Sequence, residues 1–514
     1  MAPAQLTDRQ RWIALAVLCV PLLIVSLDMT VLNVALPTLV RKLGATDSQL
    51  QWIVDAYVLV LGGLMLVSGS LSDRVGRKWT FMSGLGIFAA CSTWAALSGS
   101  AHMLIVARAF MGVGATLIMP ATLSIITNTF ADPLERQRAL GVWSATTGAS
   151  IALGPIIGGL LLAHFAWGSV FMINVPIALL GLIAAIWLVP NSRNEHPEPI
   201  DFAGSAMSIV GIGLVLWAII SAPSDGWTSA QVLVVGGAGL VLLASFAIWE
   251  SRTAHPLLRL DFFGRREFSG SVGSIGLMMF AMVGVLFVLT QFLQFQLGNT
   301  PLVAGVHMLP AAGGIALVAP FSSILVRRLG PKLCVAAGMM IVTGGLVQIS
   351  GASITSHYSS VLPGTIALGL GVGVVMPAAV GTLMGTLPSE HTGLGSATNG
   401  TVIQIGGALG VAIIGSVMSA RYQHNLTAVL VGHAMPTAVH NTIMGSVGGA
   451  LSVSAHLGGV VGGELAHAAR LAFMSGVDLS LQIAAGLAGL GILLALIVLP
   501  LRGALQVPPS KRRP

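Results

Sequence analysis

The chain has 514 residues, of which 55% are hydrophobic and only 8% charged, a composition that excludes an ordinary soluble protein of several domains. Its mean hydropathy of +0.90 indicates a polytopic membrane protein, and its first apolar segment is full length rather than a short cleavable signal. The net charge of +7 raises the question of nucleic-acid binding, which the placement of the basic residues answers.

Apolar runs long enough to cross a bilayer, which takes about 20 residues, recur along the whole chain. A first group of six covers domain 1–190, two more lie in a middle segment, 191–268, and a last group of six covers domain 269–514. We therefore predict an all-α polytopic membrane protein with two six-helix bundles and two extra central helices. The predicted spans are residues 12–36, 50–70, 80–98, 103–126, 139–163, 169–189, 203–221, 230–249, 270–292, 303–326, 333–351, 361–383, 397–419 and 477–500.

The Lys and Arg residues set the predicted orientation. With the N-terminus inside, 19 of the 24 lie in inner segments, 4 lie in outer segments and Arg108 lies within a span, which predicts cytoplasmic N- and C-termini in the cell's inner (plasma) membrane. The basic charge is thus a topology signal, and we expect no nucleic-acid partner. The stretch 442–463 is apolar, but counting it as a span would place the basic C-terminus outside. We therefore predict that 421–476 is an external loop, a helical hairpin that packs on the outer mouth.

The two six-span groups carry the same motifs in the same order, as expected of a transporter built from duplicated halves related by pseudo-twofold symmetry. The repeat fails at Asp28, Asp55 and Arg108, whose counterparts in the second half are uncharged. We infer that proton chemistry belongs to the first half and that the second half completes the cavity. The matching segments are 112–114 with 369–371, 119–121 with 376–378, and 73–78 with 327–332.

The stretch Leu27–Pro37 places an acid, Asp28, inside an apolar span, where a charge is costly and by default functional. Counting 1.5 Å per residue, Asp28 lies about 12 Å from the outer end of its span, and Asp55 and Arg108 lie at a similar depth. We predict one exchange site in which Asp28 carries the proton, Arg108 modulates it and Asp55 meets the cargo. The alternatives are a capping or kink residue for Asp28 and an outer-end residue that reaches water for Asp55.

A group of glycines in the fifth predicted span is the second candidate functional feature, after the charged residues. Span 5 contains Gly154, Pro155, Gly158 and Gly159, which combine a helix-kinking proline with a small-residue face that allows close approach of another helix. Such a face can be a pivot between conformations or a site of static packing, and both readings remain open.

The predicted inner turn at residues 69–78 is the third candidate functional feature. Gly69, Gly76 and Arg77 are candidate conformational residues there, and we group Asp73 with the proton-coupling residues. A carboxylate beside basic groups at helix ends can form salt bridges that hold one conformation and break in another.

These motifs resemble those of the major facilitator superfamily, and within it the fourteen-span drug:proton antiporters that export quaternary ammonium compounds and many drugs. The resemblance covers nearly the whole chain. It implies the major facilitator fold and a role of the span-4 arginine in proton transfer. Ser150 departs from the antiporter pattern, which has another glycine there. The segments that resemble family signatures are 27–37, 52–57, 69–78, 104–108 with Gly112 and Gly114, and 154–159.

The cargo is predicted to be a small lipophilic cation. Spans 9 to 13 contain no acid, which argues against dications, whereas one acid with aromatic faces suits a monocation through ion pairing and cation–π contact. The predicted cargo-binding residues are Asp55, Trp52, Tyr57, Asn33, Trp143, Gln291, Gln294, Asn399 and Gln404.

We therefore predict a proton-driven exporter of amphipathic, cationic drugs, dyes or biocides. One alternative is an exporter dedicated to a single metabolite or antibiotic, and another is a membrane sensor without turnover. The sequence contains no nucleotide-binding loop, catalytic nucleophile with a base, or metal-ligand spacing, which argues against an enzyme and against ATP as the energy source. We expect no cofactor, no metal and a monomer in the bilayer.

Overall fold

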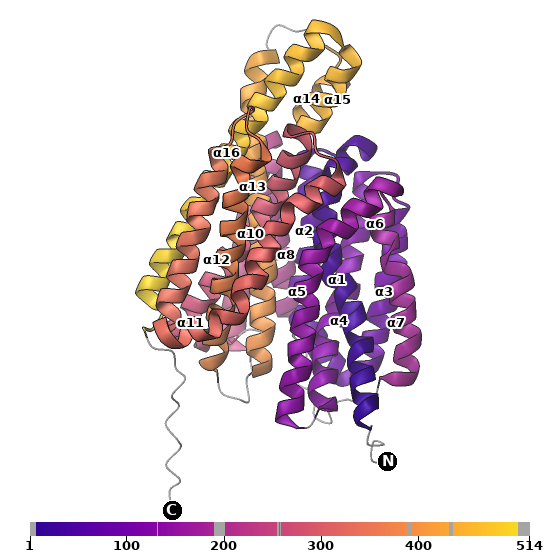
Figure 1. Cartoon of the computed structure of the whole chain (residues 1–514), viewed down its shortest axis with the longest axis vertical. Helices are drawn as coiled ribbons and strands as arrows, with labels where there is room; N and C mark the ends of the chain where they lie inside the picture. The colour runs from indigo at the N-terminus through magenta and orange to yellow at the C-terminus, as the bar shows by residue number, and fades with distance from the viewer. Residues whose placement is uncertain are drawn as a thin grey trace, which may run out of the picture.

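The computed structural model describes residues 7–130, 132–189, 201–253, 256, 259–387, 392–430 and 435–501. In these residues the chain is a bundle of long helices without a strand, so the predicted all-α architecture is confirmed (Figure 1). The first half comprises α1 (Asp8–Leu43), α2 (Asp47–Val75), α3 (Arg77–Ala96), α4 (Ala101–Thr129), α5 (Pro133–His164), α6 (Ser169–Met172) and α7 (Asn174–Leu188).

Two central helices separate this half from the second one. They are α8 (Phe202–Asp225) and α9 (Ala230–Arg252), which pack on each other. The second half comprises η1 (Leu260–Gly264), α10 (Arg266–Gln291), η2 (Phe292–Gln296), α11 (Pro301–Ser350), α12 (Tyr358–Gly385), α13 (Thr392–Leu430), α14 (Thr437–Gly445), α15 (Val447–Leu457) and α16 (Gly459–Val498).

Among the described residues, 12 helices are long and apolar enough to cross a membrane, and each overlaps one predicted span. The other two predicted spans, 80–98 and 139–163, coincide with α3 and α5. Helix α1 begins and α16 ends at one end of the bundle, whereas α14 and α15 lie beyond the opposite end (Figure 1). We call these the inner and outer ends, since the basic residues predict that the first is cytoplasmic.

The turn between α1 and α2 shows how local chemistry sets the helix boundaries. Helix α1 ends at Gly44, whose φ of 63° is left-handed and costs a glycine little. Helix α2 then begins at a capping box, in which the Thr46 side chain accepts from the Gln49 backbone N–H and the Gln49 side chain accepts from the Thr46 backbone N–H. So short a turn makes α1 and α2 antiparallel neighbours at the outer end.

The inner turns of the two halves repeat each other in backbone geometry. Gly76 separates α2 from α3 with a φ of 111°, and Gly330 lies at the corresponding turn with a φ of 81°. Predicted spans 303–326 and 333–351 are therefore the two parts of α11, which bends at Gly330. Only glycine adopts these angles without strain.

The glycines of spans 4 and 12 also occupy matching positions. A Cβ atom on Gly112 would lie 2.7 Å from the carbonyl oxygen of Tyr57 in α2, and one on Gly369 would lie 2.0 Å from that of Ala311 in the first part of α11. Each glycine lets its helix pack closely on the second helix of its own half. The duplication predicted from the motifs is thus present in the packing.

The two halves meet along two seams. Helix α2 packs on α13, and α5 packs on the first part of α11, while α8 lies against both α2 and α13. The central helix pair therefore flanks the first seam on one side.

The segment predicted as an external loop is mostly helical, and in this respect the loop assignment of 421–476 is wrong. Helix α13 continues to Leu430 and α16 begins at Gly459, and α14 and α15 lie between them. Most glycines of this segment are grouped near the helix boundaries, as at Gly458 and Gly459, whose φ values are positive, so the stretches between them remain helical. The predicted helical hairpin on the outer mouth is present as α14 and α15, which we call the outer cap (Figure 1).

The outer cap touches both halves. A Cβ on Gly448 of α15 would lie 2.7 Å from Val40 of α1 and 2.7 Å from Phe295 of η2. On the second-half side, the Tyr422 hydroxyl donates to the carbonyl oxygen of Ile443 at 2.7 Å. The cap therefore bridges the two halves across the outer end.

Candidate functional site

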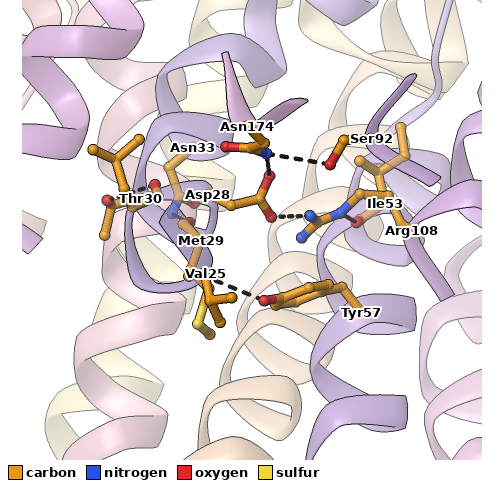
Figure 2. A network of polar contacts seen from close by, with 11 residues as sticks. Val25, Asp28, Met29, Thr30, Asn33, Ile53, Tyr57, Ser92, Arg108 and Asn174 are labelled. Carbon is orange, nitrogen blue, oxygen red and sulfur yellow. Dashed lines mark hydrogen bonds and ion pairs between the residues drawn. The ribbon is translucent and has the colours of Figure 1, made fainter. Parts of the chain in front are cut away.

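An ion pair between Asp28 of α1 and Arg108 of α4 lies inside the first half (Figure 2). Both side chains are only 1% exposed. A buried charge is tolerated when it is paired and hydrogen-bonded, and an ion pair satisfies that requirement for both residues. The structure thus brings together the two residues that were predicted to carry and modulate the proton.

Arg108 is held from two further sides. Its Nε donates to the carbonyl oxygen of Ile53 in α2 at 3.0 Å, and its guanidinium lies over the ring of Tyr57, 4.2 Å from the centroid. Tyr57 in turn donates its hydroxyl to the carbonyl oxygen of Val25 at 3.4 Å. These contacts fix the guanidinium plane and give its charge a cation–π partner in addition to Asp28.

Asp28 has a second partner that the sequence analysis missed. The side-chain amide of Asn174 in α7 donates from Nδ2 to the second carboxylate oxygen of Asp28 at 3.1 Å, and it lies 3.5 Å from the Ser92 hydroxyl in α3 (Figure 2). Asn174 is one polar residue in an otherwise apolar predicted span, and that isolation was the available signal. Three helices of the first half, α1, α4 and α7, therefore meet at Asp28, and α2 and α3 contact its two partners.

Asp55 does not join this cluster, although it was predicted to complete a three-residue site. Ile53 and Tyr57 face Arg108, and successive helix residues are about 100° apart, so Asp55 points to the opposite side of α2. The sequence count predicts only how deep each residue lies along its helix, and that depth says nothing about rotation around the helix axis. The Asp28–Arg108 ion pair and Asp55 therefore lie on opposite sides of α2.

The face of α2 that carries Asp55 forms the seam with α13. One turn toward the outer end, Gln51 accepts from the Ser416 hydroxyl at 3.1 Å, and toward the inner end a Cβ on Gly62 would lie 2.8 Å from Gln404. Asp55 is 0% exposed, and within the described part of the chain neither of its carboxylate oxygens has a hydrogen-bond partner. Such a group is costly as an anion, so it requires either a proton or a cation.

The other predicted cargo-binding residues lie in several helices. Gln294 donates to the carbonyl oxygen of Val34 at 2.8 Å and so joins η2 to α1, and Trp143 donates to the Thr122 hydroxyl at 3.2 Å. Trp52 is half-buried on α2. The buried acceptor atoms of this set without a hydrogen-bond partner among the described residues are the amide oxygens of Asn33, Gln291, Gln294 and Asn399.

The glycine–proline stretch of α5 contacts both halves. A Cβ on Gly154 would lie 1.8 Å from the Thr30 hydroxyl oxygen, so only glycine lets α5 approach α1 here. One turn on, a Cβ on Gly158 would lie 3.0 Å from Val31. Gly159 and Pro155 face the second half instead, where a Cβ on Gly305 of α11 would lie 2.1 Å from the Pro155 carbonyl oxygen.

The inner turn is described only in part. Gly69 and Asp73 lie in α2, but their side-chain positions fall outside the described structure, so the predicted role of Asp73 stays a prediction. Arg77 is the first residue of α3, directly after Gly76. Lys78 donates to the carbonyl oxygen of Ile186 at 2.7 Å and so ties α3 to the inner end of α7.

A groove of about 590 Å³ lies at the outer end of the molecule. It is lined by α13 and α16, with Asn425, Glu464 and His467 as its polar members. None of the predicted site residues lines it, so we do not assign it to the exchange site.

Comparisons with known proteins agree with this architecture. Residues 18–411 match the family model described as Major Facilitator Superfamily. The multidrug efflux pump LfrA of Mycolicibacterium smegmatis is 34% identical over 93% of this chain and 94% of its own length. The tetracenomycin C resistance and export protein of Streptomyces glaucescens is 31% identical over 95% of this chain and 91% of its own length.

A solved structure is similar over nearly the whole chain. It is a bacterial homolog of the human lysosomal transporter Spinster, which superposes with a TM-score of 0.66 over 95% of this chain and 98% of that chain. The two sequences are only 15% identical, so this similarity supports a shared fold and no shared function.

Proposed function

Because this chain belongs to the Major Facilitator Superfamily, we propose that it exports amphipathic, cationic drugs, dyes or biocides in exchange for protons, by alternating access. The observation that carries the proposal is the buried ion pair of Asp28 and Arg108 inside the first half, which is suited to bind and release a proton. Its relatives include a multidrug efflux pump and a resistance and export protein, which supports drug export.

The proton step follows from the charge balance of the pair. While Asp28 is ionised, the pair with Arg108 is neutral overall and stable in its buried position. Protonation of Asp28 leaves the guanidinium charge without its counterion, and a buried unpaired charge costs several kcal/mol. The protonated state therefore favours a conformation in which water reaches Arg108, which couples proton binding to the conformational change.

The cargo step is assigned to the seam between the halves. Asp55 offers a buried carboxylate with no partner in the described residues, which a lipophilic cation can neutralise. Trp52 and Trp143 are half-buried aromatic side chains that can face a cation, and the free amide oxygens of Asn33, Gln291 and Asn399 can accept hydrogen bonds. Tyr57 is fully buried against Arg108, so its contribution to cargo binding is indirect.

Movement between conformations is assigned to the two seams. The glycine face of α5 touches α1 on one side and α11 on the other, so it is suited to be the pivot between domains 1–190 and 269–514. Asp73 and Arg77 would hold the inner turn in one of the two conformations. We place the protein in the inner membrane as a monomer, with both termini cytoplasmic.

A dedicated exporter is the second candidate, and one observation favours it. The Streptomyces glaucescens relative is named for resistance to and export of a single compound, tetracenomycin C. Resistance profiling separates the two candidates, because a multidrug exporter raises tolerance to several unrelated dyes and biocides together, and a dedicated exporter does not.

The proposal is tested by ethidium transport in proteoliposomes with the pH difference and the membrane potential imposed separately. We expect uphill ethidium movement when a pH difference alone is imposed, and no movement without either gradient. Absence of transport under both gradients would favour the sensor without turnover. Transport driven by the potential alone, at equal pH and unaffected by pH, would contradict proton coupling.

Asp55→Asn is expected to raise the KM for ethidium about tenfold while leaving a neutral dye unaffected. The change removes the carboxylate that we assign to the cation, and loss of one charged hydrogen bond or ion pair costs about 1.5 kcal/mol or more. The measurement is the concentration dependence of efflux for both dyes. Asp47→Asn is the matched control, because Asp47 is also buried, in the first turn of the same helix. Equal loss of both dyes would contradict the assignment.

A further inference from the structure

We infer that Asn174 is a positioning residue that sets the pH at which Asp28 exchanges its proton, by donating a hydrogen bond to the carboxylate and accepting one from the protonated acid. This inference rests on the proposed proton role of Asp28. It concerns a residue that neither the sequence motifs nor the family comparison singles out.

The position of Asn174 is determined by the fold around it. It is the first residue of α7, directly after Ile173, which separates α6 from α7. A Cβ on Gly168, just before α6, would lie 2.3 Å from the carbonyl oxygen of Ala96, so this region is packed tightly on the end of α3. Asn174 itself is 0% exposed. Its amide is therefore aimed at Asp28 from a fixed backbone.

In the conformation described, the amide favours the ionised form of Asp28. Its Nδ2 donates to one carboxylate oxygen at 3.1 Å, and Arg108 donates to the other (Figure 2). Each carboxylate oxygen therefore accepts a hydrogen bond that is strongest while Asp28 is ionised. Hydrogen bonds to a charged group contribute more stabilising free energy than those between neutral groups. The Asn174 amide therefore stabilises the ionised form of Asp28 more than the protonated form.

The other end of the same amide can serve the protonated form. The Oδ1 atom of Asn174 is buried and has no hydrogen-bond partner among the described residues. Rotation of the amide by about 180° would bring this acceptor to the hydroxyl of a protonated Asp28. One side chain can thus partner both protonation states, so neither state leaves Asp28 with a buried oxygen that lacks a partner.

Few other ionisable groups lie near Asp28. Arg108 approaches from α4 and Tyr57 from α2, Asp55 lies on the far face of α2, and Cys91 is next to Ser92 in α3. Helices α6 and α7 contain no ionisable residue. In the other helices that contact α1, the ionisable residues lie near helix ends or near the bend at Gly330: Glu135, Arg136, Arg138 and His164 in α5, Arg266 and Glu267 in α10, His307, Arg327, Arg328, Lys332 and Cys334 in α11, and His456 in α15.

The test is the pH dependence of ethidium binding to the full-length protein in detergent, together with the pH dependence of its transport in proteoliposomes. Asn174→Leu keeps the size of the side chain and removes both its donor and its acceptor. The lost donor bond goes to a charged group, whereas the lost acceptor bond goes to a neutral one, so the carboxylate is destabilised more than the acid. We therefore expect the midpoint pH of binding to rise by about one unit, equivalent to a tenfold change in proton affinity.

Two further variants separate positioning from packing. Asn174→Asp keeps the shape but places a second acid beside Asp28, so the midpoint should rise at least as far as in Asn174→Leu. Ser92→Ala is the matched control, because Ser92 touches Asn174 but has no hydrogen bond to Asp28, and its midpoint should stay within about 0.3 units of the wild type.

The outcomes distinguish this inference from the proposed function. If the wild type binds ethidium without pH dependence and moves none under a pH difference, the proposed function fails. If the wild type does both and neither Asn174 variant shifts the midpoint beyond that of Ser92→Ala, the positioning role of Asn174 is wrong.

Discussion

Asp28→Asn is expected to reduce ethidium efflux driven by a pH difference at least a hundredfold. Asparagine has nearly the shape of aspartate but exchanges no proton, so the driving ion loses its binding site. The same change leaves the Arg108 guanidinium buried beside a neutral amide, at a cost of about 3–5 kcal/mol for breaking a buried pair from one side. Loss of transport could therefore arise from lost coupling or from lost stability.

A double variant separates these two effects. Asp28→Asn combined with Arg108→Gln removes both charges, so it should recover most of the thermal stability that the single variant loses. It should not recover efflux driven by the pH difference, because no proton site returns. Thermal unfolding and efflux are measured on the same preparations. Efflux that persists in Asp28→Asn under a pH difference alone would exclude Asp28 as the proton carrier.

A disulfide between Thr46→Cys and Gly445→Cys is expected to stop export, and its reduction to restore export. A Cβ built on Gly445 lies 3.6 Å from the Cβ of Thr46, within the range of about 3.5–4.5 Å that disulfides need. The bond would join the outer cap to the turn between α1 and α2, and so tie the two halves together. If cargo leaves through the outer end, the locked protein cannot release it.

The experiment uses a chain in which Cys19, Cys91 and Cys334 are replaced by alanine, so that one disulfide alone can form. Ethidium efflux is measured after oxidation and again after dithiothreitol. Each single cysteine variant is a control, since Thr46→Cys also removes a helix cap, which costs about 1 kcal/mol. Full export by the oxidised double variant would show that the outer cap need not separate from α1 and α2 during transport.

Most of the fold was predictable because the bilayer imposes long apolar helices that a sequence shows directly. The duplication was predictable as well, since Gly76 and Gly330 must be glycine for the turns that they make, and Gly112 and Gly369 must be glycine for the close helix contacts that they allow. The external segment was harder, because outside the bilayer no fixed length distinguishes a continued helix from a loop. Helix α15 packs on Val40 and Phe295, and α14 accepts a hydrogen bond from Tyr422 at Ile443.

By itself, the sequence determined the helical spans, the predicted orientation, the internal repeat and the two residues of the buried ion pair, because charge in an apolar span and glycine at a tight contact are local properties. Only the tertiary structure decided which polar groups face one another. Rotation about a helix axis separated Asp55 from Asp28, and the break before α7 brought the Asn174 amide to the Asp28 carboxylate. Those two facts depend on how neighbouring helices pack, which spacing along one chain does not specify.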